Sequence, residues 1–227
     1  MTLQPSSPAQ APQADTNRDE KLQAAMFRLG KVDDEISAGY EILGRYARTV
    51  TIFGSARLGE SSPYYQAARA TARQLAQAGY AVITGGGPGI MEAGNRGAFE
   101  VGGDSIGFNI TLPFEQNPNP HTTAAFAFRH FAPRKIVMTL YADAYVFFPG
   151  GFGTLDELSE IITLVQTGKT ARAPIILFGS GFWNSFDAFV KQHMLGDLAL
   201  ISPGDEQLYH ITDSIDDVVW RVKNKQL

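Results

Sequence analysis

The chain has 227 residues, of which 44% are hydrophobic, and it carries 19 Lys and Arg against 23 Asp and Glu and no cysteine. This composition suits a globular protein with a sizeable core, and it excludes disulfides, thiolate nucleophiles and cysteine-ligated metal centres. The formal charge of −4 comes without a basic block, so a nucleic acid polymer is not an expected partner. No segment reaches the roughly 18 apolar residues of a membrane span, and no signal-peptide pattern is present. We therefore expect a cytoplasmic protein with no membrane partner.

The N-terminal part of the sequence divides into a tail and a helical segment. Residues 1–17 are rich in Pro, Ala, Gln and Ser, and their lack of large apolar side chains predicts disorder. Residues 18–46 repeat apolar side chains at helical spacing, which predicts an N-terminal helical arm that Gly30 could divide. The apolar stripe of this arm must cover its own domain or another subunit, and the sequence leaves both open.

Apolar runs alternate with helical patterns over residues 47–227. This alternation predicts a single domain of the α/β class, with a Rossmann-like, doubly wound parallel sheet covered by helices on both faces. The predicted strands are Val50–Phe53, Ala81–Ile83, Ser105–Ile110, Ala144–Phe148, Pro174–Phe178 and Leu208–Ile211. The predicted helices are Tyr64–Ala78, Ile90–Val101, Arg134–Tyr141, Thr154–Thr167, Phe182–Leu195 and Ile215–Lys223. Residues 111–125 are rich in Pro and Asn and are predicted to form a long, functional loop.

Glycine-rich connections follow three of the predicted strands, at 54–57, 85–89 and 149–153. The carboxyl ends of parallel strands meet at one edge of a sheet, where glycines let backbone N–H groups approach an anion. Each connection alone could be a simple tight turn, but three together favour a phosphate-binding site. The residues assigned to this site from the glycine pattern are Ser55, Gly86, Gly87, Gly89 and Gly150.

Standard nucleotide-binding fingerprints are absent from these connections. None completes G-x-G-x-x-G, which disfavours a dinucleotide dehydrogenase, and G-x-x-x-x-G-K-[ST] does not occur anywhere in the chain. A monophosphate ligand therefore fits better than a dinucleotide or a Mg²⁺-bound triphosphate. The four histidines show no metal-ligand spacing, so we expect no metal site.

Two pairs of charged residues lie close to helix starts. Asp156 and Glu157 follow the last glycine connection, where Thr154 and Glu157 also fit a capping box with Glu157 folded back onto the Thr154 N–H. A carboxylate is unfavourable beside phosphate unless it acts on the ligand, so we predict a functional Glu157. We expect the helix N-terminus to keep it ionised and a poor general acid. Arg134 and Lys135 lie at the start of their predicted helix, where positive charges oppose the helix dipole. This unfavourable position is better explained by an anionic ligand or by Glu157 as partner than by a solvated pair on the surface.

The chain resembles the LOG (Lonely Guy) family of cytokinin riboside 5′-monophosphate phosphoribohydrolases, long described as lysine decarboxylases. The resemblance covers about residues 49–195. The family signature P-G-G-x-G-T-x-x-E is complete from Pro149 to Glu157, and the Arg-Lys pair is Arg134-Lys135. The G-G-G-x-x-G-x-M loop is recognisable from Gly85 to Met91 with one glycine shifted.

This resemblance implies hydrolysis of an N-glycosidic bond, releasing a base and ribose 5-phosphate, with Arg134 and Glu157 as catalytic residues. It also implies substrate binding by Glu115, Lys135, Gly151, Phe152, Gly153, Thr154 and Thr163. The implied reaction needs no cofactor and no metal, and similar proteins form homodimers or larger homo-oligomers. A decarboxylase would need a lysine that forms a Schiff base with pyridoxal phosphate, and no clear candidate is present.

Two alternatives stay open at this stage. The first is a broader AMP or nucleotide nucleosidase, because the N-terminal arm and residues 112–120 look like a longer-chain subgroup with a less certain base. The second is a non-catalytic carrier of a nucleotide or phosphorylated cofactor, which would need the glycine connections but not the pair Arg134 and Glu157.

Overall fold

The computed structural model describes residues 16–112 and 117–226, and these contain a seven-stranded sheet in which every neighbouring pair is parallel. The strand order is β4-β3-β2-β1-β5-β6-β7. The strands are β1 (Thr49–Phe53), β2 (Ala81–Thr84), β3 (Ser105–Ile110), β4 (Ala124–Phe128), β5 (Ala144–Phe147), β6 (Ile175–Phe178) and β7 (His210–Thr212). The direction of strand addition reverses between β1 and β5, the point at which open α/β sheets bind ligands. The predicted doubly wound fold is confirmed.

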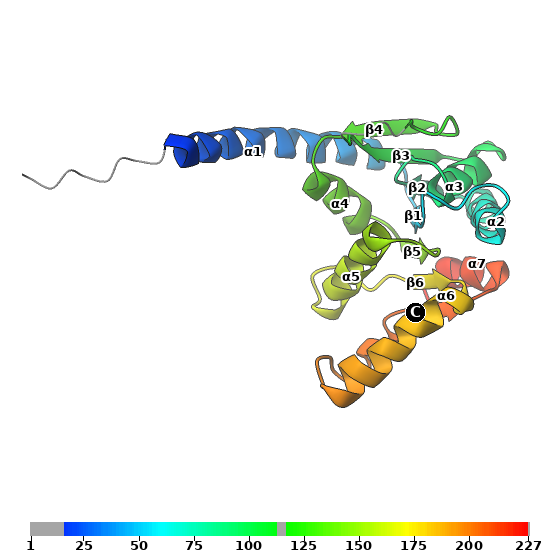
Figure 1. Ribbon diagram of the computed structural model, residues 1–227. Helices are drawn as coiled ribbons and strands as arrows, with labels where there is room; N and C mark the ends of the chain where they lie inside the picture. The colour runs from blue at the N-terminus through cyan, green and yellow to red at the C-terminus, as the bar shows by residue number, and fades with distance from the viewer. Residues whose placement is uncertain (1–15, 113–116, 227) are drawn as a thin grey trace, which may run out of the picture.

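Helices cover both faces of the sheet (Figure 1). They are α1 (Thr16–Leu43), α2 (Pro63–Gln77), α3 (Ile90–Phe99), α4 (Phe131–Leu140), α5 (Phe152–Gln166), α6 (Ser180–Phe189) and α7 (Ile215–Asn224). A π-helix, Val190–Asp197, continues α6, and a single 3₁₀ turn spans Asp205–Gln207. Among the described helices, none is both long and apolar enough to cross a bilayer.

Two separate hydrophobic clusters fill the two faces, because successive strand side chains point in opposite directions. In β1, for example, Phe53 packs into the cluster with α4, α5 and α6, whereas Ile52 packs into the cluster with α2, α3 and α7. The same alternation holds in β5, where Phe147 joins the first cluster and Val146 the second. This two-sided burial explains why the strands read as continuous apolar runs.

Strand β4 corrects the sequence analysis, which assigned residues 111–125 to a loop and placed no strand before α4. The strand pairs with β3 from Ile106 opposite Ala124 to Ile110 opposite Phe128, and it forms one edge of the sheet. Three of its five residues are alanines, which have low strand propensity, and it follows a Pro- and Asn-rich segment. Tertiary pairing with β3, rather than local sequence, therefore makes this strand.

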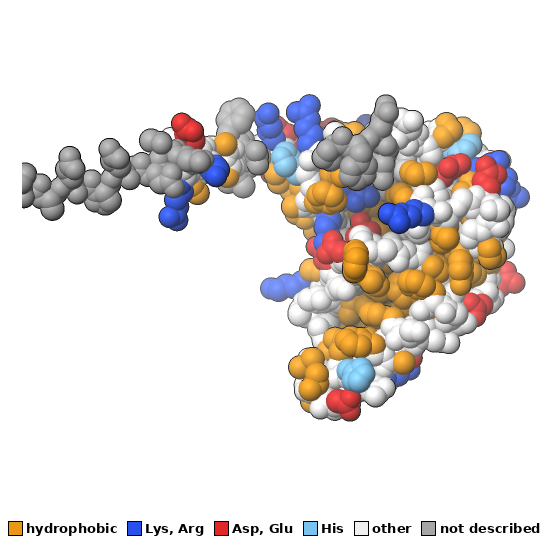
Figure 2. All heavy atoms as spheres, viewed as in Figure 1, with side chains coloured by type: hydrophobic (Ala, Val, Ile, Leu, Met, Phe, Trp, Pro, Cys, Tyr) orange, Lys and Arg blue, Asp and Glu red, His pale blue; other side chains and the backbone are white. Residues whose placement is uncertain are grey.

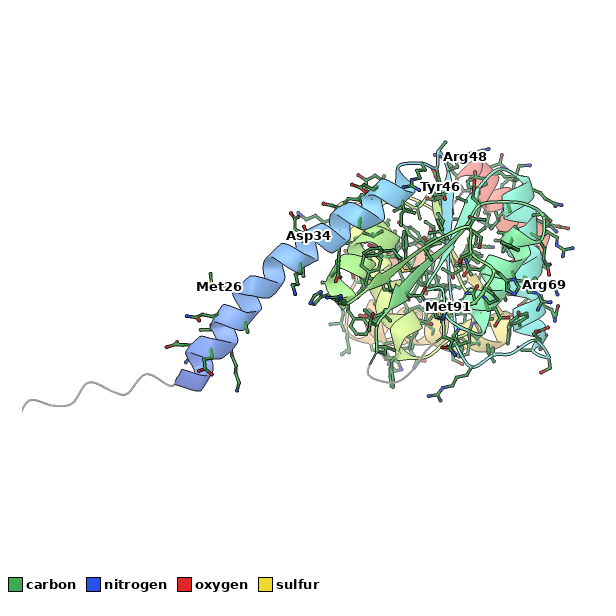
Figure 3. All side chains as sticks on the ribbon, turned by 90° about the horizontal axis from the view of Figure 1, so that it is seen from above. Met26, Asp34, Tyr46, Arg48, Arg69 and Met91 are labelled. Carbon is green, nitrogen blue, oxygen red and sulfur yellow. The ribbon has the colours of Figure 1, made fainter. Side chains whose placement is uncertain are left out.

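Helix α1 forms the N-terminal arm and continues through Gly30 without a break. Its first part projects from the body of the protein (Figures 1 and 2), and Met26 lies on that projecting part while Tyr46 lies near the sheet (Figure 3). Its last turns pack on α4, where a Cβ added at Gly39 would lie 2.6 Å from Val137 Cγ2. Part of the apolar stripe thus covers the chain's own domain. The expected tail lies outside the described residues, except for its last two positions, which begin α1.

Candidate active site

The three glycine connections meet at one edge of the sheet and are joined by backbone hydrogen bonds. The N–H of Ser55, after β1, donates to the carbonyl of Pro149, after β5, at 3.0 Å. The Ser55 carbonyl in turn accepts from the N–H of Ile90, at the start of α3, at 3.0 Å. Gly89 has a φ of +69°, and a Cβ added there would overlap the Ser55 carbonyl oxygen. The expected convergence of these connections is confirmed, with Ser55 at its centre.

A buried polar network holds the connection after β2 in place. Asn119 donates from its backbone N–H to the Gly86 carbonyl at 2.9 Å and from Nδ2 to the Gly87 carbonyl at 3.1 Å. The Gly86 N–H donates to Thr84 Oγ1 at 2.9 Å, so it is not free to bind a phosphate. Gly86 therefore leaves room beside the connection but offers no N–H donor to a ligand. The sequence analysis assigned it to the phosphate-binding site, and its role there is limited to this lack of a side chain. Sequence reasoning saw Asn119 only as a loop residue and missed its part in this network.

The start of α5 carries the glycines of the family signature and leaves its first N–H groups available. The N-cap is Gly151, no side chain among the described residues caps the helix, and Phe152 at the first helical position is 92% exposed. Thr154 lies inside the first turn and is buried, and a Cβ added at Gly150 would overlap its Oγ1. The helix therefore begins earlier than expected and the capping box does not form. Uncapped N–H groups at a helix start, as at 152–154, are suited to bind an anion.

Arg134 of α4 and Glu157 of α5 form a buried ion pair at this edge. Arg134 Nη1 donates to Glu157 Oε1 at 3.3 Å, and the two side chains are 10% and 14% exposed. Arg134 Nε also donates to the carbonyl of Phe108 in β3 at 2.7 Å. A Cβ added at Gly85 would lie 2.5 Å from Arg134 Nη2, so the glycine makes room for the guanidinium. The structure thus brings together the two residues that the resemblance implied as catalytic.

Burial raises the pKa of Glu157 to about 7, because desolvation outweighs the opposing effect of the Arg134 and Lys135 charges. This overturns the expectation that the helix N-terminus keeps the carboxylate ionised. The sequence shows the favourable helix end but not the tertiary packing that removes Glu157 from water. Glu157 can therefore exchange a proton near neutral pH, as a group in acid–base catalysis must.

Lys135 and Thr163 line the same groove, which no residue of the glycine connections lines. Lys135 Nζ forms ion pairs of 2.9 Å with both Asp156 Oδ2 and Glu160 Oε2. The groove has a volume of about 320 Å³ and is lined by Lys135, Asp156, Ser159, Glu160, Thr163 and Leu164.

The predicted substrate-binding residue Glu115 lies outside the described residues. A larger cavity of about 820 Å³ lies between α6 and residues 203–211 and includes none of the predicted site residues.

Comparison with known proteins identifies the family. A family model described as "Possible lysine decarboxylase" matches residues 91–222, more than half of the chain. The chain belongs to this family. The rice protein named "Probable cytokinin riboside 5′-monophosphate phosphoribohydrolase LOGL3" is 30% identical over 72% of this chain and 77% of its own length. The rice phosphoribohydrolase LOG is 32% identical over 64% of this chain, and the match spans 61% of that relative. Relatives of the chain in this family are thus enzymes of the N-glycosyl hydrolase class.

A solved structure shares the fold at lower sequence identity. The molybdenum cofactor binding protein from Rippkaea orientalis matches with a TM-score of 0.59 and 19% identity, over 78% of this chain and 96% of that protein. At this identity the likeness concerns the fold alone. It shows that the same parallel sheet also occurs in a protein named for binding rather than hydrolysis.

Proposed function

We propose that this protein hydrolyses the N-glycosidic bond of an adenine-type nucleoside 5′-monophosphate, cytokinin ribotides included, to the free base and ribose 5-phosphate. The observation that carries the proposal is the buried pair Arg134 and Glu157 beside an uncapped, glycine-rich helix start. The names of the rice relatives support the reaction class and the nucleotide substrate.

The first step of the proposed reaction is binding of the 5′-phosphate. The N–H groups of Phe152, Gly153 and Thr154 point out of the start of α5, where the helix dipole also favours an anion. Glu157 lies one turn further along the same helix, about 5.4 Å along its axis. A phosphate held at the helix start therefore brings the ribose near the Glu157 carboxylate, and this remote binding energy orients the glycosidic carbon.

The second step is cleavage of the bond between ribose C1′ and the base nitrogen. As the bond breaks, positive charge develops on the ribose ring, and the ionised Glu157 carboxylate stabilises it. With a pKa of about 7, the same carboxylate accepts a proton from the water that attacks C1′, while the base leaves with the electron pair of the broken bond and takes up a proton from solvent. Arg134 holds Glu157 in place through Nη1 and favours its ionised form.

The site supports a lysine decarboxylase, the activity in the description of the family model, less well than it supports the proposed hydrolysis. A Schiff-base lysine acts as a nucleophile only when it is deprotonated, which a lowered pKa favours. Burial alone would lower the pKa of Lys135, but its hydrogen bonds to Asp156 and Glu160 outweigh burial and raise it. Lys135 is therefore poorly suited to bind pyridoxal phosphate covalently, and nothing in the proposed reaction requires that cofactor.

A panel of substrates tests the proposal and separates it from the two alternatives. The protein is incubated with AMP, isopentenyladenosine 5′-monophosphate, GMP and CMP, and with the matching unphosphorylated ribosides, and the free base is measured by chromatography. We expect release from adenine-type monophosphates and at least about 100-fold lower kcat/KM for the ribosides, which lack the phosphate anchor. Equal turnover of GMP and CMP would indicate a broader nucleosidase. Binding of AMP without release of base would indicate a carrier and contradict the proposed reaction.

A further inference from the structure

Asn109 is the penultimate residue of β3 and lies at the edge of the sheet where the glycine connections meet. The residue before it, Phe108, provides the carbonyl that accepts from Arg134 Nε. Its own side chain lies against Gly86, since a Cβ added at that glycine would overlap Asn109 Oδ1. Asn109 is 9% exposed. Asn109 therefore lies between the connection after β2 and the strand that anchors Arg134.

The side-chain amide of Asn109 has no hydrogen-bond partner within the described part of the chain. The buried asparagines around it differ sharply in this respect. Asn95 accepts from Thr84 and Asn119 through Oδ1, and its Nδ2 donates to Ser105 Oγ and the Ile106 carbonyl. Asn119 likewise uses both its Nδ2 and its Oδ1. Asn109 is thus unpaired in a region where neighbouring amides are fully used.

No hydrogen bond among the described residues uses the Asn109 amide. The polar atoms of the amide are not among the fully buried side-chain atoms without a partner, so they keep contact with solvent and a ligand at this edge can reach them. The location at the carboxyl end of a strand, next to a glycine connection, points to a ligand.

The missing partner is a neutral polar group rather than a phosphate. A side-chain amide offers two donors and an acceptor, which match a hydroxyl or the edge of a purine. The N–H of Gly86, the residue in contact with Asn109, is already bonded to Thr84 Oγ1, so this N–H does not join the amide in binding an anion. Uncapped N–H groups that favour an anion lie at the start of α5.

We infer that Asn109 is a specificity-determining residue that hydrogen-bonds the nucleoside part of the substrate, either a ribose hydroxyl or the edge of the base. This inference rests on the proposed function, because it takes a nucleoside monophosphate as the ligand. It adds to the site a residue outside the glycine connections and the charged pairs.

The test compares Asn109→Ala with the wild-type protein on substrates that lack single groups. The substrates are AMP, 2′-deoxy-AMP, 3′-deoxy-AMP, purine riboside 5′-monophosphate and adenosine. We expect N109A to lower kcat/KM for AMP by about 10-fold to 100-fold, the effect of one lost substrate hydrogen bond. If Asn109 binds a ribose hydroxyl, this loss of kcat/KM should shrink to less than about threefold on the deoxy substrate that lacks that hydroxyl. If Asn109 binds the base edge, the loss should shrink in the same way on purine riboside 5′-monophosphate.

Two results would overturn the inference. The first is a kcat/KM of N109A within twofold of wild type on every substrate. The second is an equal loss of kcat/KM on all the monophosphates with no loss on adenosine, because this pattern would place the contact at the phosphate. Asn184→Ala, at an exposed position on α6, is the matched asparagine control and should leave every value unchanged. The melting temperature should stay unchanged in N109A, which removes no internal hydrogen bond, and fall in Asn119→Ala, which removes three.

Calorimetric titration with AMP separates failure of this inference from failure of the proposed function. If the wild-type protein binds AMP without hydrolysing it, the proposed reaction is wrong, but weaker binding by N109A would still support a contact with Asn109. If the wild-type protein releases adenine and N109A behaves like it in turnover and binding, the inference about Asn109 is wrong while the proposed reaction stands.

Discussion

Arg134 Nη1 contacts Glu157 Oε1 at 3.3 Å, and this buried pair links helix α4 to helix α5 at the point where the sheet reverses its strand order. Arg134 is fixed independently by the Phe108 carbonyl, so it positions Glu157 rather than following it. The pair combines a carboxyl group of raised pKa with a cation that favours its ionised form. Such a combination is typical of a group that transfers protons near neutral pH.

Turnover should rise with pH through about 7. Glu157 must be ionised to stabilise the ribosyl cation and to accept a proton, and its pKa of about 7 leaves it largely protonated below that value. We expect kcat for AMP to fall about tenfold for each pH unit below about 6, and to level off above about 8. The measurement is kcat at saturating AMP, since the phosphate of free AMP itself titrates near pH 6. A kcat that increases as the pH falls would show instead that the protonated form of Glu157 is active.

The same pKa shift should appear in the stability of the protein, with a fixed sign. The folded state binds the Glu157 proton more tightly than the unfolded chain, whose carboxyl has a pKa near 4.5. Between pH 4.5 and about 7 the unfolded state therefore loses this proton first, so this residue's contribution makes unfolding easier as the pH rises. The difference in free energy of unfolding between the wild type and Glu157→Gln should follow this trend in urea titrations. A difference that stays constant over that range would argue against a raised pKa.

Replacement of Arg134 by Met should move the pH dependence upward. The variant keeps an apolar stem but removes the cation that lowers the pKa of Glu157, so the carboxyl group would ionise only above pH 7. We expect kcat at pH 7 to fall at least about tenfold and to recover partly near pH 9, which the pH–rate profile measures. Arg134→Lys serves as the control because it keeps the charge. An R134M profile with an unmoved midpoint would show that the pair is not coupled.

Gly89→Ala should destabilise the protein and disrupt the site. Gly89 has a φ of +69°, and an added Cβ would meet the Ser55 carbonyl as well as the backbone of Ala56. Both effects oppose the substitution, and we expect a loss of about 1–3 kcal/mol in the free energy of unfolding measured with urea. Gly30→Ala is the contrasting variant, because Gly30 lies inside α1 and none of the described neighbours lies within 4 Å of its added Cβ. It should be neutral or stabilising; a larger loss in G30A than in G89A would contradict the geometry.

Glu35→Ala should loosen the N-terminal arm from the domain. Glu35 is 8% exposed, and its carboxylate accepts from the N–H groups of Arg129 and His130, at 3.2 and 3.3 Å, just before α4. Removing the acceptor leaves these donors unpaired, so we expect a loss of about 1–3 kcal/mol in unfolding free energy and faster hydrogen exchange in α1. Glu41→Ala, at an exposed position of the same helix, should change neither. Unchanged exchange in E35A would mean that other contacts dock the arm.

The local features of the site could be predicted from the sequence, because their signals are local. Glycines after buried strands mark the connections, and Arg134 and Glu157 attract notice because each charge is unusual for its place in a helix. Strand β4 could not be predicted in this way, since its alanines become a strand only by pairing with β3.

Features that depend on distant residues were beyond sequence reasoning. The pKa of Glu157 depends on packing that removes it from water, which no spacing pattern reveals. Which asparagine amides find partners depends on tertiary contacts, since Asn95 and Asn119 bond groups of other segments while Asn109 bonds none among the described residues. A sequence shows that an asparagine is present but not that its amide is left without a partner.

The most direct test of the proposed reaction is the turnover of AMP by Glu157→Gln, measured as free adenine released. The amide keeps the size of the side chain and can still contact Arg134, but it neither accepts a proton nor carries the charge that stabilises the ribosyl cation. We predict that kcat falls by about 10²-fold to 10⁴-fold while calorimetry shows AMP binding within about threefold of wild type. A variant that releases adenine at close to the wild-type rate would contradict the central role given to Glu157.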